Sequence, residues 1–319
     1  MRGEEGFWLF SDPPSARIEA DYGVTLSDPF LTHLQRGAVR LNVGGSGSFV
    51  SPDGLVMTNY HCVFDVVSYY DASGNDYLQN GFYAPTMEEE IPCVGMPATV
   101  LIDWEDVTDQ IVSGTDRETE EGWAEQRKRI SELETSEKER TGLNCRVESF
   151  FEGYFLYRYR IFDDLRLVFA PERTIGLFGG DADNFEYPRY NFDVAFLRVY
   201  QDGTPYHPTD YFRWSPNGAV PGELLFVSGN PGHSERFKTA ADLELVRDSL
   251  PFTIHRLESQ EASFQRKIQE GEEQGENTAR LQKHLVYCQN GIKMWKGRLL
   301  ALENPSILAR KREEERELF

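Results

Sequence analysis

Residues 44–62 read Gly-Gly-Ser-Gly-Ser-Phe-Val-Ser-Pro-Asp-Gly-Leu-Val-Met-Thr-Asn-Tyr-His-Cys. The small residues at the start of this stretch allow neighbouring backbones to approach closely. Asp53-Gly54 between two apolar runs is a strong signal for a β-hairpin. The second arm of that hairpin, Leu55–Thr58, ends just before His61. The sequence therefore predicts a histidine on the turn that follows a hairpin strand.

Further strand-like segments lie on both sides of this hairpin, separated by glycine, proline and asparagine at intervals typical of an all-β barrel. The predicted strands include residues 39–43, 55–58, 145–151, 154–160, 165–169, 174–178, 194–199 and 224–227. Residues 116–140 are rich in Glu, Lys and Arg, with Trp123, Ile130 and Leu133 at helical spacing, which predicts a helical insertion.

The character of the sequence changes near residue 240, after which glycines are few and helical periodicity is long. We therefore predict a mainly β domain over residues 1–238, with its helical insertion at about 106–142. Residues 239–319 are predicted to begin an α-helical domain. The charged, helix-like residues 310–319 end without a capping signal, so we expect a truncated chain.

Composition excludes several classes of function. The formal net charge of −20 over 319 residues opposes binding to nucleic-acid phosphates. No apolar run approaches the roughly 18 residues of a membrane span. The first residues contain no apolar segment before a cleavage site, so the chain is either cytoplasmic or begins after a removed leader.

No metal site or cofactor is predicted. The cysteines, Cys62, Cys93, Cys145 and Cys288, form no Cys-x-x-Cys pair, which disfavours zinc. Residues 181–185 read Asp-Ala-Asp-Asn-Phe, but the glycine and the distal glutamate of a calcium loop are missing.

His61 is the candidate general base, because an imidazole at the edge of a rigid barrel can face both a nucleophile and a carboxylate. Asp193, which opens the apolar strand 194–199, is the candidate carboxylate. A structural histidine and an ordinary strand-start aspartate are the alternatives. No serine after Asp193 lies in a Gly-x-Ser-Gly turn, and Ser228-Gly229-Asn230-Pro231 places a proline where a backbone donor is needed. We therefore expect the nucleophile outside these residues.

The sequence resembles peptidase family S46, the bacterial dipeptidyl-peptidases with a chymotrypsin-like double barrel and an inserted helical domain. The densest match, from residue 175, reads Ile-Gly-Leu-Phe-Gly-Gly-Asp-Ala-Asp-Asn. Matching segments are residues 6–8, 44–51, 53–62, 80–84, 157–159, 164–171, 175–184, 187–189 and 229–232. The resemblance implies a mainly β fold with α, containing a chymotrypsin-like (trypsin-like) barrel with a helical insertion, followed by the beginning of an α-helical domain.

The same resemblance implies a serine-type dipeptidyl-peptidase that releases dipeptides from peptides with a free N-terminus. His61 and Asp193 would be catalytic, with the serine far downstream. Asn184, Phe185 and Asn290 would bind the substrate's N-terminal amine. A periplasmic or secreted protein, a homodimer at full length, is also implied.

The sequence departs from the family pattern at three places. Tyr60 replaces a histidine, Phe185 replaces a tryptophan, and Asn191-Phe192 replaces Thr-Gly before the aspartate. These departures keep two other hypotheses open, a catalytically inactive peptide-binding relative and a truncated non-functional fragment. An ordinary secreted endopeptidase is disfavoured by the helical sequence after residue 240.

Overall fold

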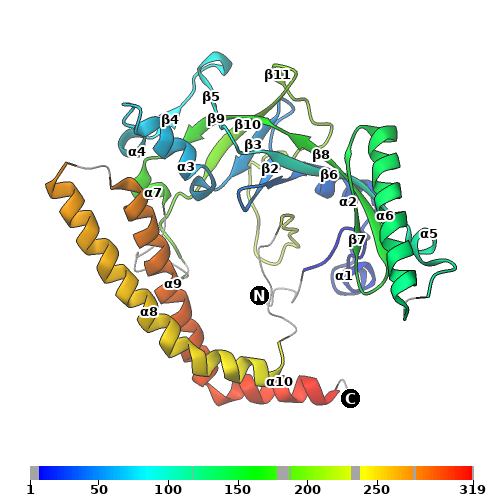
Figure 1. Cartoon of the computed structure of the whole chain (residues 1–319). Helices are drawn as coiled ribbons and strands as arrows, with labels where there is room; N and C mark the ends of the chain where they lie inside the picture. The colour runs from blue at the N-terminus through cyan, green and yellow to red at the C-terminus, as the bar shows by residue number, and fades with distance from the viewer. Residues whose placement is uncertain are drawn as a thin grey trace. The chain divides into compact units, whose positions relative to one another are not determined.

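The computed structural model describes residues 7–116, 118–177, 186, 188–230, 238–275 and 278–317, without the side chain of residue 279. Over these residues the chain is a mixed α/β protein with one large antiparallel sheet (Figure 1). The predicted combination of strands and helices is confirmed, and closure into a chymotrypsin-like barrel stays a prediction.

The chain divides into two compact units, and each is described by itself. The first unit comprises Met1–Val63, Tyr83–Phe169 and Ala195–Gly232. The second comprises Phe64–Phe82, Ala170–Val194 and His233–Phe319.

The sheet is built from strands that are mostly short. They are β1 (Ala38–Leu41), β2 (Gly45–Phe49), β3 (Leu55–Thr58), β4 (Phe82–Tyr83), β5 (Ile91–Pro92), β6 (Ala98–Asp106), β7 (Asn144–Ser149), β8 (Tyr154–Phe162), β9 (Asp164–Ala170), β10 (Ala195–Gln201) and β11 (Thr204–Pro205). Among the described residues the hydrogen-bonded order is β4-β9-β10-β3-β2-β1-β6-β8-β7, with β11 on β10 and β5 on β9. Strand β10 therefore joins the N-terminal hairpin to segments far away in the sequence.

The predicted hairpin is confirmed in β2 and β3, where Phe49 pairs with Val56. Its turn requires a glycine at position 54, because the backbone there has φ +72°. A Cβ at Gly54 would also lie 2.6 Å from the carbonyl oxygen of Tyr206. The turn therefore packs closely against the segment that follows β11.

The core of the first unit follows the period-two alternation of the strands. Inward-facing residues with at most 1% exposure are Val39, Leu41, Phe49, Val56, Leu165, Leu167, Leu197 and Val199. Burial of such apolar side chains is the main favourable term in folding. The alternation that predicted these strands is therefore the pattern that fills the core.

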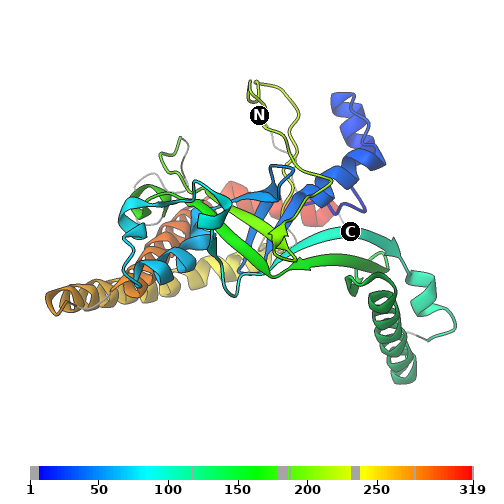
Figure 2. The ribbon, with the colours of Figure 1, turned by 90° about the horizontal axis from the view of Figure 1, so that it is seen from above.

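The predicted helical insertion forms α5 (Thr108–Val112) and α6 (Glu120–Thr141). Helix α6 lies beside the long ribbon of β6, β8 and β7, as Figure 2 shows from above. The Thr119 hydroxyl accepts a hydrogen bond from the Gly122 N–H at its start, and Gly142 ends it in the left-handed conformation. Ile130 and Leu133 pack on a small core, whereas Trp123 is 46% exposed.

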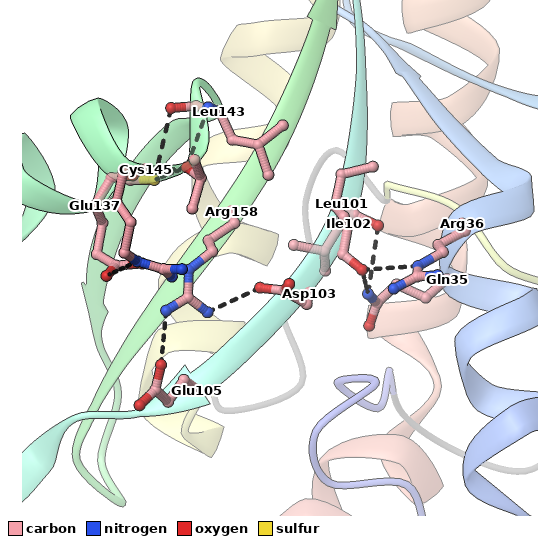
Figure 3. A network of polar contacts seen from close by, with 12 residues as sticks. Gln35, Arg36, Leu101, Ile102, Asp103, Glu105, Glu137, Leu143, Cys145 and Arg158 are labelled. Atoms are coloured by element: carbon pink, nitrogen blue, oxygen red, sulfur yellow. Dashed lines mark hydrogen bonds and ion pairs between the residues drawn. The ribbon is translucent and has the colours of Figure 1, made fainter.

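Arg158 of β8 joins this helix to the ribbon (Figure 3). Its guanidinium donates to Glu137 of α6 at 2.7 Å, to Asp103 of β6 at 2.9 Å and to Glu105 of β6 at 2.6 Å. The Arg158 side chain is 9% exposed and that of Glu137 is 14% exposed, so this bond is shielded from water. The two partners from β6 are about half exposed and contribute less.

Short N-terminal helices complete the first unit. They are α1 (Ser15–Tyr22) and α2 (Asp28–Gly37), and a 3₁₀ turn covers Met87–Glu89. Gln35 and Arg36 of α2 donate to the carbonyl of Ile102, which ties the helix to β6 (Figure 3).

The second unit contains the helices that the periodicity after residue 240 predicts, whereas the start of a separate α-helical domain at residue 239 stays a prediction. Its helices are α4 (Tyr77–Asn80), α7 (Arg173–Gly176), α8 (Ala240–Glu273), α9 (Ala279–Glu303) and α10 (Pro305–Glu317). Leu250, Ile254 and Leu302 form the core between the long helices. The helix α3 (Tyr60–Asp71) begins in the first unit and continues into the second.

Two predicted strands are wrong. Residues 174–178 were expected in a strand, but Arg173–Gly176 form α7. Residues 224–227 belong to no strand, although their side chains still alternate between half-buried and exposed. Phe226 packs edge-to-face on Phe30 at 5.1 Å. The alternation therefore reflects one side of this segment packing on the protein, although the segment pairs with no strand.

We predict that Glu137→Gln lowers the free energy of unfolding by about 1–2 kcal/mol, because it weakens a shielded charge-assisted hydrogen bond. Urea denaturation measures this difference. The control is Glu139→Gln, an exposed position on the same helix, which should change stability by less than about 0.5 kcal/mol. Equal effects of the two changes would contradict the role given to Arg158.

The stabilisation by Glu137 should depend on pH. Hydrogen bonds from Arg140 and, against the opposing effect of burial, from Arg158 lower the pKa of Glu137 to about 2, from 4.5. A lowered pKa stabilises the folded state above the unfolded value and is lost as the pH falls through the folded value. The stability difference between the wild type and Glu137→Gln should therefore be full above pH 4.5 and vanish near pH 2. A constant difference across that window would contradict the assignment.

Candidate active site

His61 follows the hairpin directly, as predicted, but it lies in a helix rather than on a turn. Strand β3 ends at Thr58, and α3 begins at Tyr60 after a single residue. Tyr60, Val63 and Phe64 of this helix are at most 1% exposed. These buried side chains fix the helix and leave His61 half-buried in its first turn.

Asp193 precedes strand β10, whose first residue, Ala195, pairs with Thr58 of β3. Because the two strands are antiparallel, the chain enters β10 at the end where it leaves β3. The sequence prediction that Asp193 opens an apolar strand is confirmed, since Ala195 and the following inward residues are fully buried. Asp193 itself is half-buried and lies in the second unit, whereas His61 lies in the first.

The small residues of β2 permit the close packing that was predicted for them. A Cβ at Gly45 would lie 2.3 Å from the Sγ atom of Cys62, and one at Gly47 would lie 2.8 Å from Val56. Both positions must be glycine if the neighbouring residues keep their places. Because of the close approach at Gly45, Cys62, the neighbour of His61, packs directly against the hairpin.

Ser46 has a role that the sequence did not reveal. Its hydroxyl accepts a hydrogen bond from the backbone N–H of Asn230 at 2.7 Å. A Cβ at Gly229 would lie 3.1 Å from the same hydroxyl oxygen, so the two segments are in close contact. The match of residues 229–232 to a glycine-rich family motif was the only available signal of this position.

Two other histidines contact carboxylates in the first unit. The Nδ1 atom of His33 lies 3.1 Å from Asp210, and that of His207 lies 3.4 Å from Asp53. Each contact links two segments that are distant in the sequence. His207 also contacts the carbonyl of Pro52 at 3.0 Å. A histidine–carboxylate contact therefore does not by itself identify a catalytic base in this protein.

The predicted amine-binding residues fall in different places. Asn184 and Phe185 lie outside the described residues. Asn290 is half-buried in α9, next to Gly291, whose missing Cβ would contact Leu257 of α8 at 3.4 Å. The two departures that the structure describes are the fully buried Tyr60, which anchors α3, and Phe192, which is 46% exposed.

The described residues offer no other obvious reaction centre. They contain no group of three or more His, Cys, Asp or Glu side chains arranged to hold a metal ion. All four cysteines are free thiols. Burial raises the pKa of the Cys93 thiol to about 12, which makes it an unreactive core residue. None of the helices in the described segments combines the length and apolar character of a membrane span.

Comparisons with known proteins agree on one family. The sequence model of Peptidase S46 matches residues 3–319. The Asp/Glu-specific dipeptidyl-peptidase of Flavobacterium psychrophilum is 30% identical over 302 residues, which cover 89% of this chain and 42% of that protein. The dipeptidyl-peptidase 7 of Porphyromonas gingivalis is 30% identical over 267 residues, covering 76% of this chain and 37% of that protein.

The fold is similar to that of a solved relative. The crystal structure of Porphyromonas endodontalis DPP11 in complex with the dipeptide Arg-Asp gives a TM-score of 0.80 at 22% identity. The similarity covers 97% of this chain and 48% of the DPP11 chain. The chain thus spans less than half the length of these relatives.

We predict that Gly45→Ala destabilises the protein by about 1–3 kcal/mol, because the added methyl group overlaps the Cys62 sulfur. The second change Cys62→Ala removes that sulfur and should recover most of the loss. Thermal unfolding of the two single variants and the double variant measures the coupling. Additive effects would show that Gly45 and Cys62 do not press on each other.

Proposed function

This chain belongs to peptidase family S46, and we propose that the complete protein is a serine-type dipeptidyl-peptidase. It would release dipeptides from peptides with a free N-terminus. The observation that carries this proposal is the arrangement of two strands. His61 follows the end of β3, and Asp193 precedes the start of β10, where Thr58 pairs with Ala195.

In this mechanism His61 is the general base and Asp193 orients it. A serine supplied from outside these residues attacks the carbonyl carbon of the substrate's second residue, and His61 accepts the hydroxyl proton. When the peptide C–N bond breaks, His61 gives this proton to the leaving amine. Water then hydrolyses the acyl-enzyme, releases the dipeptide and restores the serine.

The N-terminal amine of the substrate would be held by Asn184, Phe185 and Asn290, by resemblance to the family. Asparagine carbonyl oxygens accept hydrogen bonds from an ammonium group. An aromatic ring can face the same cation. A pocket that ends at the amine fixes the distance to the cleaved bond, which explains release of two residues at a time.

Further properties follow from the family resemblance and are part of the same proposal. The N-terminal strands would belong to a chymotrypsin-like barrel, and residues 239–319 to an α-helical domain that continues beyond them. The complete protein would be a periplasmic or secreted homodimer.

The proposal predicts that the complete protein releases dipeptides from free-amine peptides and leaves N-acetylated copies uncut. An acetyl group removes the positive charge that the amine site recognises. Mass spectrometry of the products measures both reactions. Equal cleavage of acetylated peptides would contradict the exopeptidase, and binding of peptides without cleavage would instead identify a non-catalytic relative.

We also predict that His61→Ala lowers kcat/KM by roughly 10³-fold or more, and Asp193→Asn by roughly 10³–10⁴-fold. The matched controls are His33→Ala and Asp210→Asn, which alter a histidine–aspartate contact of 3.1 Å elsewhere in the first unit. These controls should retain activity within about threefold, since neither residue belongs to the candidate site. A loss of activity in the controls equal to that in the candidate residues would contradict the assignment.

A further inference from the structure

A cavity of about 510 Å³ lies within the first unit, beside the N-terminal hairpin. Its walls come from one face of the ribbon, from residues 7–10 and from the glycine-rich start of β2. The register explains the shared face, because Arg40 of β1 lies opposite Thr99 of β6, and Tyr159 of β8 lies opposite Leu101. Residues from several distant segments thus form one concave surface.

The walls of the cavity are largely aromatic. Trp8, Phe10, Tyr157 and Tyr159 all line it. The two tyrosine rings stack at 6.1 Å with an interplanar angle of 18°, and Phe150 meets Tyr157 edge-to-face at 6.1 Å. Such surfaces favour flat, apolar ligand groups.

Tyr157 contributes its ring to this wall rather than a free hydroxyl. The residue is 6% exposed, and its hydroxyl is buried beside the Ser11 side chain. The wall is therefore aromatic and apolar at this point.

Two charges border the cavity, Arg40 and Glu148. The Arg40 side chain is exposed and forms no ion pair with the described residues. A guanidinium in this position fits the carboxylate at the end of a short peptide.

The cavity shares a wall residue with the contact that holds the segment of the candidate general base. Gly44 and Gly45 line it, and Gly45 presses against Cys62, which is the neighbour of His61 in the chain. Gly229 and Asn230 also line it, and the hydrogen bond from Asn230 to Ser46 holds that rim on β2. The glycine-rich start of β2 is therefore common to the cavity wall and to the packing of Cys62, the neighbour of His61 in the chain.

We propose that this cavity binds the leaving part of the peptide, on the carboxyl side of the cleaved bond. It takes an aromatic side chain of the peptide against Trp8 and the two stacked tyrosines. Arg40 pairs with the terminal carboxylate of short peptides. This inference rests on the proposed peptidase function.

The first test uses the complete protein and two kinds of substrate that share their first two residues. One is a dipeptidyl amide with a fluorogenic leaving group, and the other carries Phe-Gly after the cleaved bond. The ratio of kcat/KM for the peptide to that for the amide should fall about tenfold in Trp8→Ala. The matched control is Trp123→Ala, since Trp8 is 43% and Trp123 46% exposed, and its ratio should equal that of the wild type.

Arg40→Gln should lower kcat/KM about tenfold for the peptide with a free C-terminal carboxylate. The kcat/KM for the same peptide with a C-terminal amide should stay at the wild-type value. An unchanged ratio in Trp8→Ala would overturn the proposal. If Trp8→Ala lowers the unfolding temperature but leaves the peptide-to-amide ratio of kcat/KM unchanged, Trp8 serves internal packing, and the proposal is overturned as well.

A second measurement separates this inference from the proposed function. Calorimetry on His61→Ala protein should detect binding of the dipeptide Phe-Gly, weakened about tenfold by the additional change Trp8→Ala. If the wild type cleaves no peptide, the peptidase proposal fails while this binding still supports the pocket. If the wild type cleaves peptides but Phe-Gly does not bind, the pocket assignment fails alone.

Discussion

The pairing of β3 with β10 is the contact on which the first unit depends. It joins the N-terminal hairpin to a strand that comes after the insertion and after strands β8 and β9. Because side chains alternate along a strand, a shift of one residue would turn Val56 and Leu197 away from the core. The same register brings the chain out of β3 and into β10 at one end of the sheet.

The insertion is fixed by a different kind of interaction. Its helix has a low apolar content, and much of its surface is charged. A small apolar core, formed by Ile111, Tyr154 and their neighbours, is supplemented by the contacts of Arg158 with three carboxylates. Such polar contacts require a defined geometry, which apolar burial alone does not impose. The sequence could indicate a helix here, but not the arginine two strands away that positions it.

Local sequence predicted those elements whose signals are themselves local. The Asp-Gly turn, the alternating strands and the start of β10 were all found because turn chemistry and period-two patterning act over a few residues. Thr174–Gly176 was misread because β-branched and apolar residues suggested a strand, whereas a single helical turn forms there. Residues 224–227 show that alternation reports which face is covered, and not whether a neighbouring strand is present. The cavity beside β2 could not be predicted, since it depends on residues brought together by long-range register.

His61 lies in the first turn of α3 and not on a loop. In this position a protonated imidazole depends more on a nearby carboxylate than it would on a loop. The N-terminal end of a helix carries partial positive charge, which opposes a protonated imidazole in its first turn. No acidic side chain lies in the first turn of α3 to offset that charge. If His61 is the base, as proposed, the proton that it holds during peptide cleavage would need a negative charge from another segment. In the proposed mechanism Asp193 provides it.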